Sequence, residues 1–259
     1  MHFKKTLEKK KVIKGGLNLK LERICKNFDE IKVLHNFSLN VKDKEITCIL
    51  GPSGCGKSTL LNIIAGIIKP DEGIIGDNKK KIGYVFQEDR LLPWKTVYEN
   101  IKLVNKKASD LKLKSLIELV GLTNFENKYP HQLSGGMRQR CSIARAFNFQ
   151  AELLLMDEPF KSLDYDLRIN MVKSLIDIWH QWNNSVVFVT HEIDEAVLLG
   201  NKIVVLTKNP CTVRNVINID MPQNIRTLED KELISIRTKL IKILSKQKDI
   251  KETSEFKSA

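Results

Sequence analysis

Short, mainly apolar runs alternate along the chain with segments in which apolar residues recur at a helical period. These runs cover 46–50, 82–86, 153–156, 185–190 and 203–206. A run of this length without polar alternation is typical of a strand buried on both faces. The pattern therefore predicts an α/β core whose parallel sheet is covered by helices on both sides.

Two further patterns surround this predicted core. From Leu17 to Asn40 apolar and polar residues alternate, which predicts antiparallel strands. Between Thr96 and Phe149 the period is helical, and one apolar helix face closes at Gly121, a residue type that ends helices. That face consists of Leu113, Leu116, Ile117 and Val120. We expect an antiparallel β subdomain and a helical subdomain inserted into the core.

The end of the chain is simpler. An alternating run at 212–219 predicts one more strand, and a helix is expected from Gln223 onward. The polar stretch 246–259 is expected to be disordered.

These patterns divide the chain into three parts. A basic extension occupies 1–16, one large domain occupies 17–222, and a C-terminal helix with a polar tail occupies 223–259. The helical subdomain of the large domain spans about 95–149.

One glycine-rich stretch stands between the first apolar run and a helical segment. It consists of Gly51, Pro52, Ser53, Gly54, Cys55, Gly56, Lys57, Ser58 and Thr59. A match to G-x-x-x-x-G-K-[ST] between a strand and a helix predicts a phosphate-binding loop. Its glycines let several backbone N–H groups point at one spot, and the helix adds its positive N-terminal end. Lys57 would reach the β- and γ-phosphates, and the Ser58 hydroxyl would bind Mg²⁺. The alternative is a flexible glycine turn without a ligand.

Polar residues also follow three of the other apolar runs. They are Gln87, the adjacent Asp157 and Glu158, and His191. Because ligands of open parallel sheets bind at the carboxyl ends of the strands, we expect these side chains to converge on the phosphate loop. Asp157 is the expected outer ligand of Mg²⁺, through water or the Ser58 hydroxyl. Glu158 would polarise a water for attack on the γ-phosphate.

The other two strand-end residues have supporting roles in this prediction. His191 would contact the γ-phosphate and orient Glu158 or the water, and Gln87 would bind Mg²⁺ or sense the attacking water. Taken singly, a lone histidine is more often structural, and two adjacent acids can simply solvate a strand end.

The stretch 133–140 predicts a second anion site. Ser134 is a helix N-cap residue, and Gly135 and Gly136 leave backbone N–H groups bare at the helix start. If the helical subdomain projects outward, this site cannot share a phosphate with Lys57 of the same chain. Two copies arranged head to tail would solve this, with each copy sealing the other's nucleotide. The alternative is an ordinary capped helix.

The amino-acid composition places only a weak restriction on the class of binding partner. The net charge of +12 and the pI near 9.4 suit anionic partners such as nucleotides, nucleic acid or acidic lipids. The lysines are spread over all predicted loops and helix faces, and few aromatic residues lie between them. This dispersal favours ordinary solvated lysines over a nucleic-acid surface.

The apolar runs and the cysteines of the sequence bear on the cellular compartment and on the redox state of the thiols. No apolar run reaches the roughly 18 residues that a membrane span needs, and the basic segment 1–14 lacks a secretory apolar stretch. We therefore expect a cytosolic protein. Its five cysteines are scattered without a CxxC pair, which favours reduced thiols over disulfides or zinc. A redox switch at Cys55 is conceivable, but a spectator thiol is the simpler interpretation.

In their order along the chain, these motifs resemble those of the ATP-binding subunits of ABC (ATP-binding cassette) transporters, over about Leu19 to Pro222. The stretch Gly51 to Thr59 is similar to Walker A, Gln87 to the Q-loop, 133–139 to the family signature, 153–158 to Walker B, 162–164 to the D-loop and His191 to the switch histidine. The resemblance implies a P-loop NTPase (RecA-like) core with a parallel sheet, an antiparallel β subdomain and an inserted helical subdomain. It also implies ATP and Mg²⁺ as cofactors.

The resemblance assigns expected roles to single residues. Catalytic roles fall on Glu158, His191 and Gln87, and Mg²⁺ is expected on Ser58, Gln87 and Asp157. Outside the phosphate loop, nucleotide contacts are expected from Ser134, Gly135, Gly136, Gln139, Asp164 and Phe28. Phe28 falls where the family usually has an aromatic residue that stacks on adenine, although it could equally be a core residue.

The resemblance implies a homodimer that closes on two Mg-ATP and drives two transmembrane permease subunits from the cytoplasmic side of the membrane. The stretch 85–94 is particularly similar to the nitrate, sulfonate, taurine and bicarbonate importer branch, which implies an extracytoplasmic solute-binding protein and a small anionic, sulfonate- or nitrate-like solute. Exposed Leu91, Leu92 and Trp94 would form an apolar docking site for the permease, unless they pack in the core.

Two other function classes compete with this prediction. A soluble ABC ATPase acting on nucleic acid or ribosomes would suit the charge, but a single cassette with a compact insertion disfavours it, so no nucleic acid is expected. A nucleotide-binding regulator without turnover conflicts with intact Glu158 and His191. Two departures from the family are a short segment between Gly73 and Ile82, and Lys161 where a small or apolar residue is usual.

Overall fold

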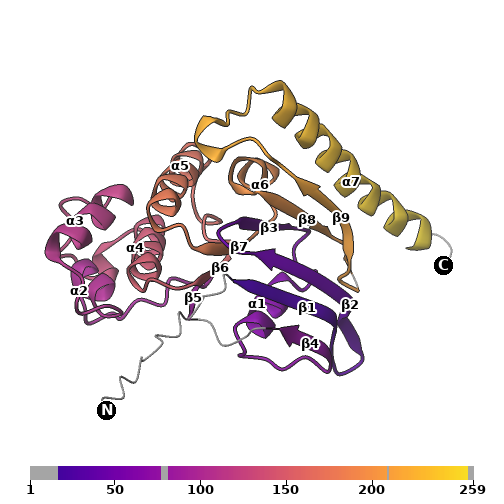
Figure 1. Cartoon of the computed structure of the whole chain (residues 1–259), viewed down its shortest axis with the longest axis horizontal. Helices are drawn as coiled ribbons and strands as arrows, with labels where there is room; N and C mark the ends of the chain where they lie inside the picture. The colour runs from indigo at the N-terminus through magenta and orange to yellow at the C-terminus, as the bar shows by residue number, and fades with distance from the viewer. Residues whose placement is uncertain (1–16, 77–80, 209, 256–259) are drawn as a thin grey trace, which may run out of the picture.

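We describe a computed structural model of residues 17–76, 81–208 and 210–255 (Figure 1). The predicted N-terminal extension at 1–16 and the end of the predicted tail at 256–259 lie outside these residues.

A six-stranded sheet forms the centre of the described structure, in the order β5-β6-β7-β3-β8-β9. Its strands are β3 (Ile46–Leu50), β5 (Ile82–Val85), β6 (Leu153–Asp157), β7 (Ser185–Thr190), β8 (Lys202–Leu206) and β9 (Val213–Asn218). The first five in the spatial order pair in parallel, and β9 pairs antiparallel with β8. The predicted parallel α/β core is therefore confirmed, with one antiparallel edge strand.

The apolar strands are buried on both faces because successive side chains enter two different cores. In β7, Val186 and Phe188 join one apolar cluster, whereas Val187 and Val189 join the other. The same alternation holds in β6 and β8. This explains why these strands have no polar alternation in the sequence.

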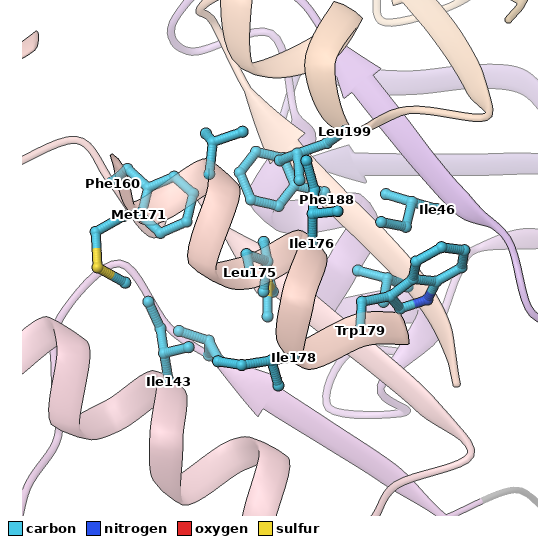
Figure 2. Close-up of a cluster of buried hydrophobic side chains, with 14 of the residues drawn as sticks. Ile46, Ile143, Phe160, Met171, Leu175, Ile176, Ile178, Trp179, Phe188 and Leu199 are labelled. Atoms are coloured by element: carbon cyan, nitrogen blue, oxygen red, sulfur yellow. The ribbon is translucent and has the colours of Figure 1, made fainter. Parts of the chain in front are cut away.

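Helices α5 (Tyr165–Trp182) and α6 (Ile193–Leu199) contribute to the first cluster. In Figure 2, Leu175 and Ile176 of α5 lie between Ile143 of a neighbouring helix and Phe188 of the sheet. One face of the sheet, α5 and the helix that carries Ile143 thus share one continuous apolar core.

The opposite face of the sheet is covered by α1 (Lys57–Ile64) and a second sheet. That sheet has the order β2-β1-β4 among the described residues, and its pairs are antiparallel. Its strands are β1 (Asn18–Phe28), β2 (Ile31–Lys42) and β4 (Glu72–Gly76). The predicted antiparallel strands are confirmed.

A helical segment lies between β5 and β6, to the left in Figure 1. It contains α2 (Val97–Lys102), α3 (Asp110–Leu119), the short 3₁₀ helix η1 (Pro130–Gln132) and α4 (Gly135–Asn148). The predicted apolar face of α3 is buried. Gly121 adopts a φ of 63°, the left-handed conformation that ends a helix.

The C-terminal region departs from the sequence prediction. After the 3₁₀ helix η2 (Gln223–Ile225), α7 begins only at Lys231 and continues to Glu255, so disorder from residue 246 is wrong. The late start follows from Gln223, whose amide donates to the Leu199 carbonyl and to Asn201 and holds the chain against the core. The helix continues because 231–255 contains neither Gly nor Pro. Among the residues that the structure describes, no helix combines the length and the apolar character that crossing a bilayer requires.

Candidate nucleotide-binding and catalytic site

The stretch after β3 folds as a tight loop that leads directly into α1. Gly54 and Gly56 have φ values of 74° and 103°, a region that favours glycine. A Cβ at Gly56 would lie 2.8 Å from Cγ1 of Val33, so a larger residue has no room there. Because α1 begins at Lys57, its N-terminal N–H groups face the loop.

Lys57 ties this loop to the end of β6. Its Nζ donates to the carbonyl oxygens of Gly51 at 2.8 Å and Pro52 at 2.9 Å. The same Nζ lies 3.3 Å from Oε1 of Glu158, and the lysine side chain is buried. A buried ammonium needs such partners, and a phosphate could replace them.

Glu158 is held in an unusual backbone conformation at the end of β6. Its φ is 44°, in the left-handed region, and its N–H donates to the Val189 carbonyl at 3.0 Å. Its carboxylate lies 3.1 Å from Nδ1 of His191 and 3.4 Å from Nζ of Lys161. A non-glycine residue in this region is strained, and the strain persists only where surrounding contacts hold the backbone. Such residues cluster at functional sites.

The two adjacent acids have opposite pKa shifts. Burial would raise the pKa of Glu158, but Lys57, His191 and Lys161 together bring it below its usual value. Burial raises the pKa of Asp157, and a hydrogen bond with Ser58 only partly offsets this. Glu158 is therefore ionised as a base must be, whereas Asp157 would gain from a bound cation.

Ser58, Gln87 and Asp157 line one hollow of about 410 Å³. All three side chains offer oxygen atoms, which Mg²⁺ prefers as ligands. The side chains of Ser58 and Asp157 also form a hydrogen bond. Among the described residues, no group of three or more His, Cys, Asp or Glu side chains could hold a metal ion. A site with few protein oxygens fits Mg²⁺, which keeps several waters and binds phosphate oxygens.

The second predicted anion site lies at the start of α4. Ser134 caps this helix, and its Oγ accepts from the N–H of Met137 at 3.3 Å. Gly135 is exposed, whereas a Cβ at Gly136 would lie 2.6 Å from Cδ2 of Leu163. Gly135 and Ser162 line a hollow of about 430 Å³ that includes no phosphate-loop residue. The two predicted anion sites therefore open into different hollows of one chain, although Gln87 lines both.

Three of the remaining site residues are placed as follows. Gln139 is buried, and its amide donates to the Phe86 carbonyl at 3.1 Å, so it supports the segment before Gln87. Asp164 caps α5 by accepting from the Leu167 N–H at 2.9 Å. Phe28 is 42% exposed at the end of β1, so it is a surface aromatic residue and not a core residue.

Comparisons with known proteins decide the family. A family model described as ABC transporter matches residues 34–161. An uncharacterized ABC transporter ATP-binding protein of Methanocaldococcus jannaschii is 39% identical, and the match covers 92% of this chain and 95% of that protein. This chain belongs to the ATP-binding subunits of ABC transporters. The cassette is an ATPase, and the resemblance drawn from its motifs is confirmed.

Two further comparisons are close over most of the cassette. An aliphatic sulfonates import ATP-binding protein of Bacillus anthracis is 44% identical, over 75% of this chain and 82% of that protein. A dimeric ATP-binding cassette in a post-hydrolysis state, bound to ADP and Pi, is a solved structure with 33% identity and a TM-score of 0.69. The match covers 78% of this chain and 99% of the solved chain. ATP binding by this cassette follows from the family.

Nothing in the sequence pattern singles out the arginines that brace the segment after Gln87. In the cassette, Arg138 Nε donates to Asp89 Oδ2 at 2.8 Å. Arg145 donates to the backbone carbonyls of Asp89 at 3.0 Å and Arg90 at 2.9 Å. Both arginines come from α4, so three hydrogen bonds join this helix to the segment after Gln87.

A second bracing contact reaches His191. Arg168 of α5 lies 2.6 Å from the carboxylate of Glu192, which lies 3.5 Å from Nε2 of His191. His191 therefore sits between Glu158 on one side and Glu192 on the other. Only the fold reveals this link, because nothing in the sequence pairs Arg168 with Glu192.

The predicted apolar docking site is partly wrong. Leu91 is buried with Val97 and Ile101 in the main core, so it cannot contact a partner. Leu92 is half-buried, and Trp94 is 69% exposed.

The turn that presents Trp94 is fixed by the buried Asn100. Its amide nitrogen donates to the carbonyl oxygens of Leu92, Lys95 and Thr96, and its amide oxygen accepts from the Leu92 N–H. The exposed indole is therefore carried by a rigid turn.

A larger hollow of about 560 Å³ lies between β9 and α7, far along the chain from these motifs. Arg214, Lys239 and Lys242 line it. It includes none of the phosphate-loop or strand-end residues, so size alone does not identify the nucleotide site.

Proposed function

We propose that this chain is the ATPase subunit of an importer for a small organic anion, with aliphatic sulfonates as the solute class. The solute class is supported by relatives named as aliphatic sulfonates import proteins, at 40 to 44% identity. ATP binding and hydrolysis would drive two transmembrane permease subunits, which receive solute from an extracytoplasmic binding protein. The cassette would lie on the cytoplasmic side of the membrane.

The convergence of Lys57, Glu158 and His191 is the single observation that carries the proposed mechanism. They follow three neighbouring parallel strands, β3, β6 and β7. Nζ of Lys57 lies 3.3 Å from Glu158, and Nδ1 of His191 lies 3.1 Å from Glu158. Arriving ATP would draw Lys57 from Glu158 onto its β- and γ-phosphates, because a triphosphate carries more negative charge than one carboxylate. This exchange frees one oxygen of Glu158.

Glu158 would then accept a proton from the water that attacks the γ-phosphate in line. His191, held by Glu158 and Glu192, would contact the γ-phosphate and fix the direction of the carboxylate. Ser58, Asp157 and Gln87 would hold Mg²⁺, which would neutralise part of the charge on the phosphates. Phe28 would stack on adenine, since its aromatic ring is partly exposed at the end of β1.

We infer a head-to-tail homodimer from the separation of the two anion sites. Ser134, Gly135 and Gly136 would close on the γ-phosphate held by Lys57 of the other copy. Asp164, exposed at the start of α5, would lie at the same interface. Dimeric solved cassettes with 33% identity support this arrangement.

Coupling to the permease would run through the Q-loop segment. Gln87 lines the hollow of Ser58 and Asp157, and the same segment presents Trp94 seven residues further on. Arg138 and Arg145 fix this segment to α4. Closure of the nucleotide site would therefore shift the exposed indole that contacts the permease.

Reconstitution tests this function. The chain would be placed in liposomes with the permease subunits encoded beside it and with the matching binding protein, and ATP-dependent transport of radiolabelled ethanesulfonate would be measured. We expect transport with the wild type and none with Glu158→Gln. Transport of nitrate or bicarbonate in place of the sulfonate would contradict the solute class. ATP hydrolysis that no permease or solute changes would contradict the importer.

The class of soluble ABC ATPases acting on nucleic acid or ribosomes is not favoured. The relatives at about 40% identity are named as transporter components, and the positive charge is explained by dispersed lysines.

A further inference from the structure

Two cysteines that lie far apart in the sequence meet beside the phosphate loop. Cys55 belongs to that loop, and Cys211 lies between β8 and β9. Cys211 is anchored to β2, because its N–H donates to the Val33 carbonyl at 2.9 Å and its carbonyl accepts from the His35 N–H at 3.3 Å. The loop thiol therefore faces a fixed partner.

The contacts around the loop place the two side chains together. A Cβ built on Gly56 would lie 3.5 Å from Cβ of Cys211, so the residue next to Cys55 is already in contact with it. The two thiols form a hydrogen bond, and both belong to the same apolar cluster. A disulfide joins Cβ atoms about 3.5–4.5 Å apart, so bond formation requires the loop to bring Cys55 within this separation of Cys211.

The other cysteines differ in their surroundings. Burial raises the pKa of Cys48 and of Cys141, so neither is the thiol that forms an attacking thiolate most readily. The hydrogen bond from Cys211 lowers the pKa of Cys55 below its usual value, although burial opposes it, and Lys57 adds to the effect. The same hydrogen bond and burial raise the pKa of Cys211. A lowered pKa on one thiol and a raised pKa on its neighbour are typical of an attacking thiolate beside a protonated partner.

We propose that Cys55 and Cys211 form a modification site at which a peroxide makes a disulfide, and that this disulfide weakens nucleotide binding. The Cys55 thiolate attacks one peroxide oxygen, which gives a sulfenic acid and, for hydrogen peroxide, one water. The Cys211 sulfur then attacks the sulfenic sulfur, the S–O bond breaks, and a second water leaves. Two thiols and one peroxide thus become one disulfide and two waters.

The disulfide acts on binding because Cys55 is part of the phosphate cradle. The loop must keep the N–H groups around Gly54 and Gly56 directed at one point, and its backbone depends on left-handed conformations at both glycines. A bond from Cys55 to Cys211 would fix the loop to β2 and turn it away from that geometry. Bound Mg-ATP would hold the loop in place and slow the oxidation in return.

Oxidation of the purified full-length chain by hydrogen peroxide tests this proposal. We expect a peptide pair joined through Cys55 and Cys211 in mass spectra, and a loss of Mg-ATP affinity of at least roughly tenfold. Dithiothreitol should restore the affinity, and Mg-ATP added before the peroxide should slow the loss. Hydrolysis by the reduced protein is measured separately, so a failure here leaves the proposed importer function untouched.

Cys211→Ser is the decisive variant, with Cys211→Ala as a second choice if the first folds poorly. Reduced Cys211→Ser should bind Mg-ATP like the wild type and should show no loss of affinity that dithiothreitol reverses. Cys25→Ser removes a half-buried thiol elsewhere and should behave like the wild type. The proposal is overturned if no joined peptide forms, or if the joined protein binds Mg-ATP as tightly as the reduced protein.

Discussion

Nζ of Lys57 lies 3.3 Å from Oε1 of Glu158, so the phosphate-loop lysine and the expected base neutralise each other before nucleotide arrives. Both side chains are buried, and neither charge would be tolerated there alone. We expect the pair to separate when a triphosphate binds, because the phosphates compete with Glu158 for the Lys57 ammonium. After that separation, Nζ of Lys161 and Nδ1 of His191 would remain beside the Glu158 carboxylate.

Lys161→Ala should move the acidic limb of the pH–rate profile to higher pH. Lys161 helps to lower the pKa of Glu158, so its removal leaves more of this carboxylate protonated at a given acidic pH. Lys161 is half exposed, and we expect a change of less than about twofold in kcat at pH 7. Lys161→Arg should keep the wild-type profile, as should Lys173→Ala, which removes an exposed lysine of α5. An unshifted acidic limb in Lys161→Ala would exclude this role.

The two signature glycines should respond differently to alanine. A Cβ at Gly136 would lie 2.6 Å from Cδ2 of the buried Leu163, so Gly136→Ala should lower the free energy of unfolding by about 1 kcal/mol. A Cβ at Gly135 would have Nη2 of Arg138 3.8 Å away, which is ordinary contact. Gly135→Ala should therefore keep the stability of the single chain, yet lower ATPase activity if Gly135 closes on a partner's nucleotide. Urea unfolding and ATPase assays of both variants separate the two effects, and equal stability losses would refute the distinction.

Glu195 should make the folded chain less stable as pH rises. Burial raises its pKa from 4.5 to about 7, although Thr190 and Arg168 partly offset this. Between these two values the folded state keeps a proton that the unfolded state has lost. The contribution of this group to the free energy of unfolding is therefore greatest below about pH 4.5. It falls by an amount on the order of 3 kcal/mol by the time the pH exceeds 7.

Glu195→Gln removes this titration and should flatten the decline. Urea unfolding at a series of pH values measures the difference between the variant and the wild type. Glu118→Gln, at an exposed position of α3, is the control and should follow the wild type. Parallel curves for wild type and Glu195→Gln would show that the buried carboxyl titrates normally.

Trp94→Ala should weaken association with the permease without changing nucleotide binding. Trp94 is 69% exposed and is carried by the turn that Asn100 fixes, so its loss leaves the core intact. We expect an affinity loss of roughly tenfold or more if the indole is an anchor of the interface. Leu111→Ala, at an 81% exposed apolar residue of α3, is the matched control. Unchanged co-purification of Trp94→Ala with the permease would remove this docking site.

Much of the fold was predictable because its signals are local. The apolar strands, the glycine loop and Gly121 each carry their structure in their own residue types, and the structure agrees with all three. The start of α7 could not be predicted, because Gln223 is held by Leu199 and Asn201, which belong to another part of the chain. The length of α7 does not follow from polar composition, because polar residues without Gly or Pro can continue a helix.

The candidate site shows the same limit. The strand-end rule predicted that Lys57, Glu158 and His191 would meet, and their distances agree with it. Exposure could not be predicted from residue type, and Leu91 is therefore buried where a surface was expected. The thiol pair of Cys55 and Cys211 depends on how β2 carries the loop after β8, which no sequence spacing reveals.

The mass of Glu158→Gln in Mg-ATP, measured by gel filtration with light scattering, tests the head-to-tail site most directly. Without its base the variant should bind ATP and not release it by hydrolysis, so we expect a species of twice the 29.7 kDa chain mass. Adding Ser134→Arg should return it to a single chain that still binds ATP, because the phosphate loop is intact. A single-chain mass for Glu158→Gln at saturating Mg-ATP would contradict the account.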